Sequence, residues 1–185
     1  MYFNKAGASN TDSALDIAFQ EAKKRKIKNM VIATTRGATA AKAAERAGKS
    51  GINLVVVTHN TGFNKLGEQQ LEEGYLKILR EKKVRIITGT LPARSLGRSV
   101  REKLGFNPLD MITEAWKVFG EGTKVCIEIT ASACDAGAIP AEDVISVAGS
   151  WEGADTVLLL SAMPSNRMLD IKVREILAKP ADWRY

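Results

Sequence analysis

The sequence predicts an α/β protein with three layers, in which helices cover both faces of a mostly parallel sheet. Short apolar runs rich in β-branched residues, such as 31–33 and 52–57, alternate along the chain with segments that repeat apolar residues at helical spacing. Such runs are typical of strands buried on both faces, and strands that alternate with helices form parallel βα units. The length of 185 residues fits a single domain over residues 1–185.

The strands can be placed from these runs. They are expected at 29–33, 52–57, 84–87, 144–148 and 156–160, with an edge strand at 171–177 that Pro180 ends. The connection between residues 148 and 156 is too short for a parallel crossover. Strand 156–160 should therefore run antiparallel to strand 144–148.

Helices are expected between these strands. The first should begin at Thr11 or Ser13, because Ser13 and Asp16 form a capping-box pattern. Its buried face should consist of Leu15, Ala18, Phe19 and Ala22. An alanine-rich second helix should run to about Lys49 and end before Gly51. The third should turn inward Leu71, Tyr75, Ile78 and Leu79.

The helices of the second half are marked by start and stop signals. Apolar residues repeat every four positions over 96–104, and Gly105 closes that helix. Asn107 followed by Pro108 indicates a helix start, and this helix should bury four apolar side chains. They are Leu109, Ile112, Trp116 and Phe119. Residues 125–130 have strand propensity, yet Cys126, Ile129 and Ala133 share one helical face, so we expect a helix over 123–137.

Composition excludes several classes of protein. A hydrophobic content of 45% with 26% charged residues is ordinary for a globular chain and excludes disorder. No uninterrupted apolar stretch reaches membrane-spanning length and no signal peptide is recognised at Met1–Lys5, so a soluble cytoplasmic protein without a membrane partner is expected. One histidine and two cysteines, Cys126 and Cys134, cannot furnish a structural zinc site, and free thiols are expected.

The net charge of +6 raises nucleic acid as a partner. The densest basic run, 23–28, falls at the end of the first helix, where cations complement the helix dipole. No aromatic residues interleave this run, as a single-strand binder would require. A solvated helix end is the better interpretation, and nucleic acid is an unlikely partner.

The segment after the first strand has the composition of a phosphate-binding turn. It consists of Thr34, Thr35, Arg36, Gly37, Ala38 and Thr39. The first N–H groups of a helix have no intrahelical partner, and the dipole favours an anion there. Gly37 lets the backbone approach, the hydroxyls can donate, and Arg36 can pair with the anion. Neither a Walker lysine nor a GxGxxG pattern is present, so an ordinary βα turn is the alternative.

Two other segments should lie at the same edge of the sheet, because ligands of parallel α/β sheets bind at the carboxyl ends of strands. The first consists of His59, Asn60, Thr61, Gly62 and Phe63. The second is a glycine-bounded loop that includes Gly149, Ser150, Trp151 and Gly153. Trp151 can stack on a planar ring or pack against the sheet edge, and His59 can contact a ligand or only its own turn. Glu128 and Asp135 are expected on a helix that flanks the pocket.

These motifs together resemble the C-terminal domain of pyruvate kinase, and still more a group of small stand-alone relatives called pyruvate kinase α/β-domain proteins. The resemblance covers nearly the whole chain. It is carried by 14–18, 31–40, 54–59, 62–63, 135–137 with Pro140, 144–149, 153–157 and 174–180.

The resemblance implies the fold and the site in more detail. It implies a core strand order 3-2-1-4-5, numbering the five strands from 29–33 onward, with the last antiparallel. It also implies that Thr34, Thr35, Gly37 and Thr39 grip a phosphate and that 149–153 corresponds to the effector loop of pyruvate kinases with an allosteric sugar-bisphosphate site. Because the phosphotransfer machinery of that enzyme lies in a barrel domain, pyruvate kinase activity should be absent.

Three classes of function stay open. The sequence favours a binding module for a phosphorylated small molecule, and whether it catalyses a reaction is left open. An enzyme that acts on such a ligand, with or without flavin, and a nucleic-acid binder are the alternatives. The expected ligand is a mononucleotide, flavin mononucleotide (FMN), because Glu152 repels a second phosphate whereas a ring can stack on Trp151 or Phe63. Assembly into a homo-oligomer is compatible with the sequence.

Overall fold

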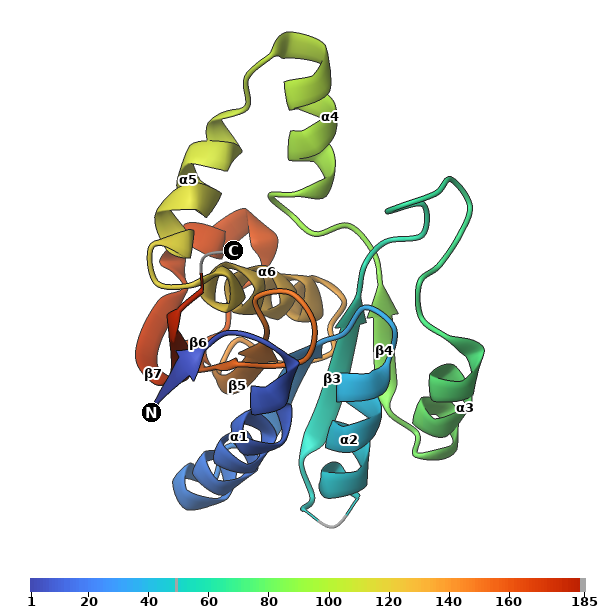
Figure 1. Ribbon diagram of the computed structural model, residues 1–185, viewed down its shortest axis with the longest axis vertical. Coiled ribbons are helices and arrows are strands. Elements are labelled where there is room, and N and C mark those ends of the chain that lie inside the picture. The colour runs from blue at the N-terminus through green and yellow to red at the C-terminus, as the bar shows by residue number, and fades with distance from the viewer. Residues whose placement is uncertain (49, 184–185) are drawn as a thin grey trace.

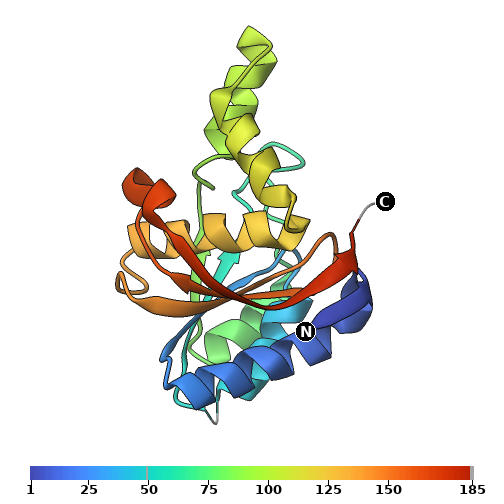
Figure 2. The ribbon, with the colours of Figure 1, turned by 90° about the vertical axis from the view of Figure 1, so that its left-hand side faces the viewer.

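The computed structural model describes residues 1–48 and 50–183, and within them the chain forms one mixed sheet with helices on both faces (Figures 1 and 2). The sheet has seven strands in the order β1-β7-β6-β5-β2-β3-β4. The strands are β1 (Tyr2–Lys5), β2 (Asn29–Ala33), β3 (Asn53–Thr58), β4 (Arg85–Thr88), β5 (Asp143–Ala148), β6 (Thr156–Ser161) and β7 (Lys172–Asp182). The predicted α/β class with a mostly parallel sheet is confirmed.

The centre of the sheet is parallel. β2 pairs in parallel with β3 on one side and with β5 on the other, and β3 pairs in parallel with β4. β5 and β6 are antiparallel, with Ala148 opposite Thr156, as the short connection between them requires. All parallel core strands therefore present their carboxyl ends at one edge, where the loops after β2, β3 and β5 lie.

The helices form two layers around this sheet. They are α1 (Thr11–Arg25), α2 (Ala38–Ala47), α3 (Glu73–Glu81), α4 (Ser95–Leu104), α5 (Pro108–Lys117) and α6 (Glu121–Asp135), with short 3-10 helices at Ala8–Asn10 and Ser165–Asp170. α1, α2 and α3 cover one face and α6 covers the other (Figure 2). The helix predicted over 123–137 is confirmed by α6. The expected end of the second helix at Lys49 lies outside the described residues.

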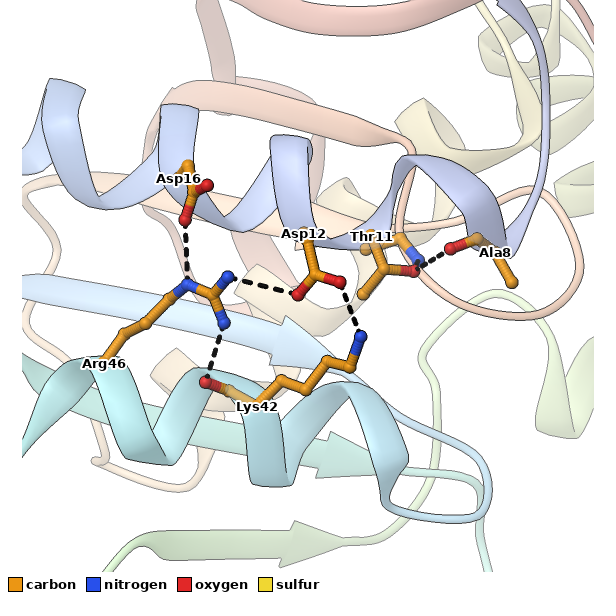
Figure 3. Close-up of polar contacts among 7 residues, drawn as sticks. Ala8, Thr11, Asp12, Asp16, Lys42 and Arg46 are labelled. Atoms are coloured by element: carbon orange, nitrogen blue, oxygen red, sulfur yellow. Dashed lines mark hydrogen bonds and ion pairs between the residues drawn. The ribbon is translucent and has the colours of Figure 1, made fainter.

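α1 and α2 are joined by charged side chains on their exposed sides (Figure 3). Lys42 pairs with Asp12 at 2.7 Å, and Arg46 reaches Asp12 at 3.1 Å and Asp16 at 2.9 Å. Asp16 thus does not complete the predicted capping box. Thr11 is already the first residue of α1, and its hydroxyl donates to the Ala8 carbonyl at 2.7 Å.

The prediction that Pro180 ends the last strand is wrong. β7 continues to Asp182, and β1, which sequence analysis missed, pairs with it in parallel, with Phe3 opposite Pro180. The pairing of β7 with β6 ends at Ala178, opposite Val157. Pro180 therefore has a strand on one side only, where a missing N–H is tolerated.

α4 and α5 form an arm that projects from the rest of the molecule (Figures 1 and 2). Asn107 caps α5 as predicted, with its side chain accepting from the Leu109 N–H at 3.3 Å. The prediction that this helix buries Leu109 and Phe119 is wrong, since they are 38% and 53% exposed. Helical periodicity indicates an apolar stripe but does not show what covers it.

Among the described residues, no helix combines the length and the apolar character that crossing a membrane would require.

Candidate functional site

The turn after β2 and the loop between β5 and β6 meet at the carboxyl edge of the sheet. The Thr34 N–H donates to the Val57 carbonyl of β3 at 3.0 Å, which fixes the start of the turn beside the end of β3. The Arg36 guanidinium lies 3.7 Å from the Glu152 carboxylate of the 149–153 loop. Two segments more than a hundred residues apart thus lie side by side at this edge.

The turn leads directly into the N-terminus of α2. Gly37 is the N-cap residue, with φ of 115°, and its carbonyl accepts from the Ala41 N–H at 2.9 Å. The N–H groups of residues 38–40 are the orphan donors of this first turn, and a glycine N-cap offers them no side-chain acceptor. Thr34 and Thr39 are buried, whereas Arg36 and Ala38 are exposed and Thr35 is half-buried.

Gly37 also has a packing role that the sequence did not indicate. Its left-handed backbone favours glycine, but a side chain there would meet α3 instead of an open ligand site. A Cβ at this position would collide with Tyr75 and lie 2.8 Å from Leu71 Cδ1. The Glu72 N–H also donates to the Arg36 carbonyl at 3.0 Å. The glycine therefore lets the turn pack tightly against α3.

The 149–153 loop is held by a buried carboxylate. Asp155 is fully buried and accepts from the N–H groups of Gly7 at 3.0 Å and Ser150 at 3.2 Å, and from the Thr156 hydroxyl at 2.8 Å. A Cβ on Gly149 would collide with the Gly153 backbone, so the two ends of the loop lie in close contact. Trp151 is 79% exposed, so its side chain is not buried against the sheet.

The segment after β3 is organised around stacked rings. His59 stacks on Phe63 with 3.9 Å between ring centroids, and the Arg94 guanidinium lies 4.6 Å from the Phe63 centroid. Phe63 is thus already engaged and is a poor platform for a ligand ring. His59 Nδ1 lies 3.0 Å from Gln70 Oε1, which can only accept, so Nδ1 carries the proton and Nε2 is an acceptor.

Burial lowers the pKa of His59 below its ordinary value, and the charges of Arg94 and Lys124 lower it further, against the hydrogen bond to Gln70. The folded protein therefore takes up less proton at this ring than the unfolded chain does. The free energy of unfolding should fall as pH drops from about 7.5 to about 5. A His59→Asn protein should lose less over the same range, as urea unfolding at both pH values would show. Equal losses in the two proteins would contradict the lowered pKa.

Sequence reasoning missed Lys124 as part of this site. Lys124 is 5% exposed and Glu128 fully buried on α6, and the Lys124 ammonium donates to Glu128 Oε2. The signal was present, since a lysine and a glutamate four residues apart occur in a helix that is otherwise apolar or small. Glu128 and Asp135 were both expected on a helix that flanks the pocket, and both lie on α6, but Asp135 is exposed and accepts from the Ser165 N–H at 2.8 Å. Asp135 is thereby engaged outside this cluster.

The two cysteines are free, as predicted, and both lie on α6. Burial raises the pKa of Cys126 to about 12 and that of Cys134 to about 11. Both thiols are therefore protonated at neutral pH and poor nucleophiles. The described residues contain no cluster of histidine, cysteine and acidic side chains that could hold a metal ion.

Two surface cavities lie away from the carboxyl edge. One, of about 440 Å³, lies at the opposite edge of the sheet. We call it the basic cavity because Arg25, Lys26 and Lys28 line it, together with the acidic Glu142 and Asp143. The other, of about 450 Å³, is largely apolar and lies between α5, α6 and β7. The basic cavity is a competing place for an anion and serves below as a control site.

Comparison with known proteins gives little further information. No protein-family model matches the chain. A crystal structure of O-ureido-L-serine synthase is similar at a TM-score of 0.34 and 14% identity, over 74% of this chain. The match spans 50% of that chain, and at this score it carries no argument about fold or function.

Proposed function

We propose that this protein binds a phosphorylated small molecule at the carboxyl edge of its sheet, with the phosphate at the N-terminus of α2. Three features of the turn after β2 and the start of α2 support this proposal. They are the orphan N–H groups of residues 38–40, the hydroxyls of Thr34 and Thr39, and the Arg36 guanidinium. A helix N-terminus, hydroxyl donors and a guanidinium are the groups that bind phosphate in proteins.

Arg36 is the side chain best suited to respond to a ligand. Its ion pair with Glu152 is long, at 3.7 Å, and both side chains are about two-thirds exposed, at 66% and 64%. Exposed pairs of this kind contribute little to stability, so the guanidinium can turn to a phosphate at small cost. The released Glu152 would then disfavour a second phosphate on the same ligand, which supports a monophosphate.

FMN is the ligand that we propose for this site. Trp151 supports this choice, because it is exposed on the loop that faces the phosphate turn and offers a large flat surface for a planar ring. The resemblance to stand-alone pyruvate kinase α/β-domain proteins supports the phosphate turn on other grounds and remains part of the proposal. An enzyme that uses the bound flavin is the second candidate, favoured by the neutral His59 beside the buried Lys124–Glu128 pair.

Calorimetric titrations test this proposal. FMN, riboflavin and fructose 1,6-bisphosphate are each titrated into the protein. FMN should bind, and riboflavin, which lacks the phosphate, should bind at least about tenfold more weakly. Arg36→Gln should weaken FMN binding by about tenfold, since it removes a charge-assisted hydrogen bond. Arg80→Gln is the matched control, because it removes the same charge from an exposed position. Arg80 lies in the last turn of α3, whereas the Arg36 backbone contacts Glu72 just before the start of that helix.

Equal binding of FMN and riboflavin, or equal effects of the two arginine substitutions, would contradict the placement of the phosphate. Tight binding of the bisphosphate without FMN would overturn FMN as the ligand and leave the phosphate site standing.

A further inference from the structure

The buried ion pair on α6 has an unused acceptor. Glu128 is fully buried, and only its Oε2 receives the Lys124 ammonium. Among the described residues, Glu128 Oε1 has no hydrogen-bond partner. A buried carboxylate oxygen without a donor is costly, and native proteins keep few of them. The question is therefore which group donates a hydrogen bond to Glu128 Oε1.

The pair lies toward the site at the carboxyl edge. Lys124, Glu128 and Ser132 recur every four residues and thus form one stripe along α6. At one end of this stripe the Ser132 hydroxyl lies 3.4 Å from the carbonyl of Thr90, in the segment after β4. Gly122, which lies two residues before Lys124 and on another side of α6, packs against Thr156 at the start of β6, so this end of the helix lies at the same edge. The charges of both Lys124 and Glu128 also act on the His59 ring.

A purely structural role does not explain the pair well. Buried ion pairs generally contribute less to stability than apolar side chains of similar volume would. One that served only the fold would also be expected to satisfy both carboxylate oxygens. The arrangement instead leaves the buried Glu128 Oε1 without a donor, in a charge pair that acts on the His59 ring, and His59 Nε2 is a second acceptor.

We propose that Glu128 Oε1, together with His59 Nε2, accepts hydrogen bonds from hydroxyl groups that adjoin the phosphate of the ligand. This inference rests on the proposed phosphate site at α2. Because β2 and β3 are neighbours, about 4.8 Å apart, groups within a few bonds of a phosphate at the end of β2 can reach His59 at the end of β3. Lys124 is a positioning residue that holds the Glu128 carboxylate through Oε2. The site should therefore bind phosphomonoesters of polyols and should not favour simple alkyl phosphates.

Two probes of equal chain length separate the hydroxyl groups from the phosphate. Ribitol 5-phosphate carries hydroxyls along five carbons, and pentyl phosphate carries none. The protein should bind ribitol 5-phosphate at least about tenfold more tightly than pentyl phosphate in calorimetric titrations. In the paired variant Lys124→Met with Glu128→Leu, which replaces the ion pair with apolar side chains, the difference should shrink to about threefold or less.

Arg36→Gln shows which of the two claims fails. It should weaken both probes by the same factor, because both carry the phosphate. If both probes bind equally well to the unaltered protein and Arg36→Gln weakens both, the hydroxyl subsite is overturned and the phosphate site stands. If neither probe binds, or Arg36→Gln changes nothing, the phosphate site is overturned and this inference with it. A preference for ribitol 5-phosphate that survives in a folded paired variant would overturn the role of Glu128.

Discussion

A Lys124→Met protein should unfold with a free energy about 3–5 kcal/mol lower than that of the unaltered protein. The substitution leaves the fully buried Glu128 carboxylate without its cation. An unpaired buried charge is among the most destabilising changes known for proteins. Urea unfolding followed by circular dichroism measures the loss.

The paired variant Lys124→Met with Glu128→Leu is the control for this loss. It removes both charges and keeps apolar volume, so its free energy of unfolding should return to within about 1 kcal/mol of the original value or exceed it. A paired variant as unstable as Lys124→Met alone would contradict the view that the ion pair is retained for ligand recognition and not for stability.

Gly37→Ala should lower the free energy of unfolding by about 2–4 kcal/mol. Two costs combine at this position, since the backbone has φ of 115° and the new Cβ would collide with Tyr75 and crowd Leu71. The same urea experiment measures the effect. The loss is expected without any ligand, because the strain lies within the fold.

Gly74→Ala is the matched control for this substitution. Gly74 lies in the first turn of α3, has a negative φ, and has open space where a Cβ would be. It should gain up to about 1 kcal/mol from the lower entropy of the unfolded chain. Similar effects of the two substitutions would show that the contact between the turn and α3 is not as tight as described.

Much of the sheet could be predicted from the sequence, because its central strands are buried on both faces. β2 and β3 read as continuous apolar runs, and a connection of a few residues fixed β6 as antiparallel to β5. β1 could not be predicted, since its four residues alternate weakly and only Phe3 is buried. Its pairing with β7 depends on a contact between the two ends of the chain.

Local sequence was less informative where tertiary contacts determine whether a side chain is buried. The apolar stripe of α5 indicated burial, but the arm stands away from the sheet, so Leu109 at the start of this helix remains exposed. Gly37 was recognised as a special position, yet sequence spacing does not show that α3 fills the space beside it. Lys124 was missed because its burial follows from the packing of α6 against the sheet.

The candidate site was predictable in outline because parallel strands bring their following loops to one edge. Arg36 and the 149–153 loop do lie together. The functions of individual residues were not predictable, since Phe63 is already engaged with His59 and Arg94, and Asp155 anchors the loop through its carboxylate. Such details depend on side-chain orientation, which composition and spacing do not specify.

The backbone amide signals of residues 38–40, followed by NMR as FMN is added, test the central claim most directly. Amides at a helix N-terminus that donate hydrogen bonds to a phosphate should show the largest shifts in the protein, and Arg36→Gln should reduce these shifts at equal FMN concentration. The amides of Lys26 and Lys28, beside the basic cavity at the opposite edge, should stay unchanged. Shifts centred on Lys26 and Lys28, with residues 38–40 unaffected, would contradict the account.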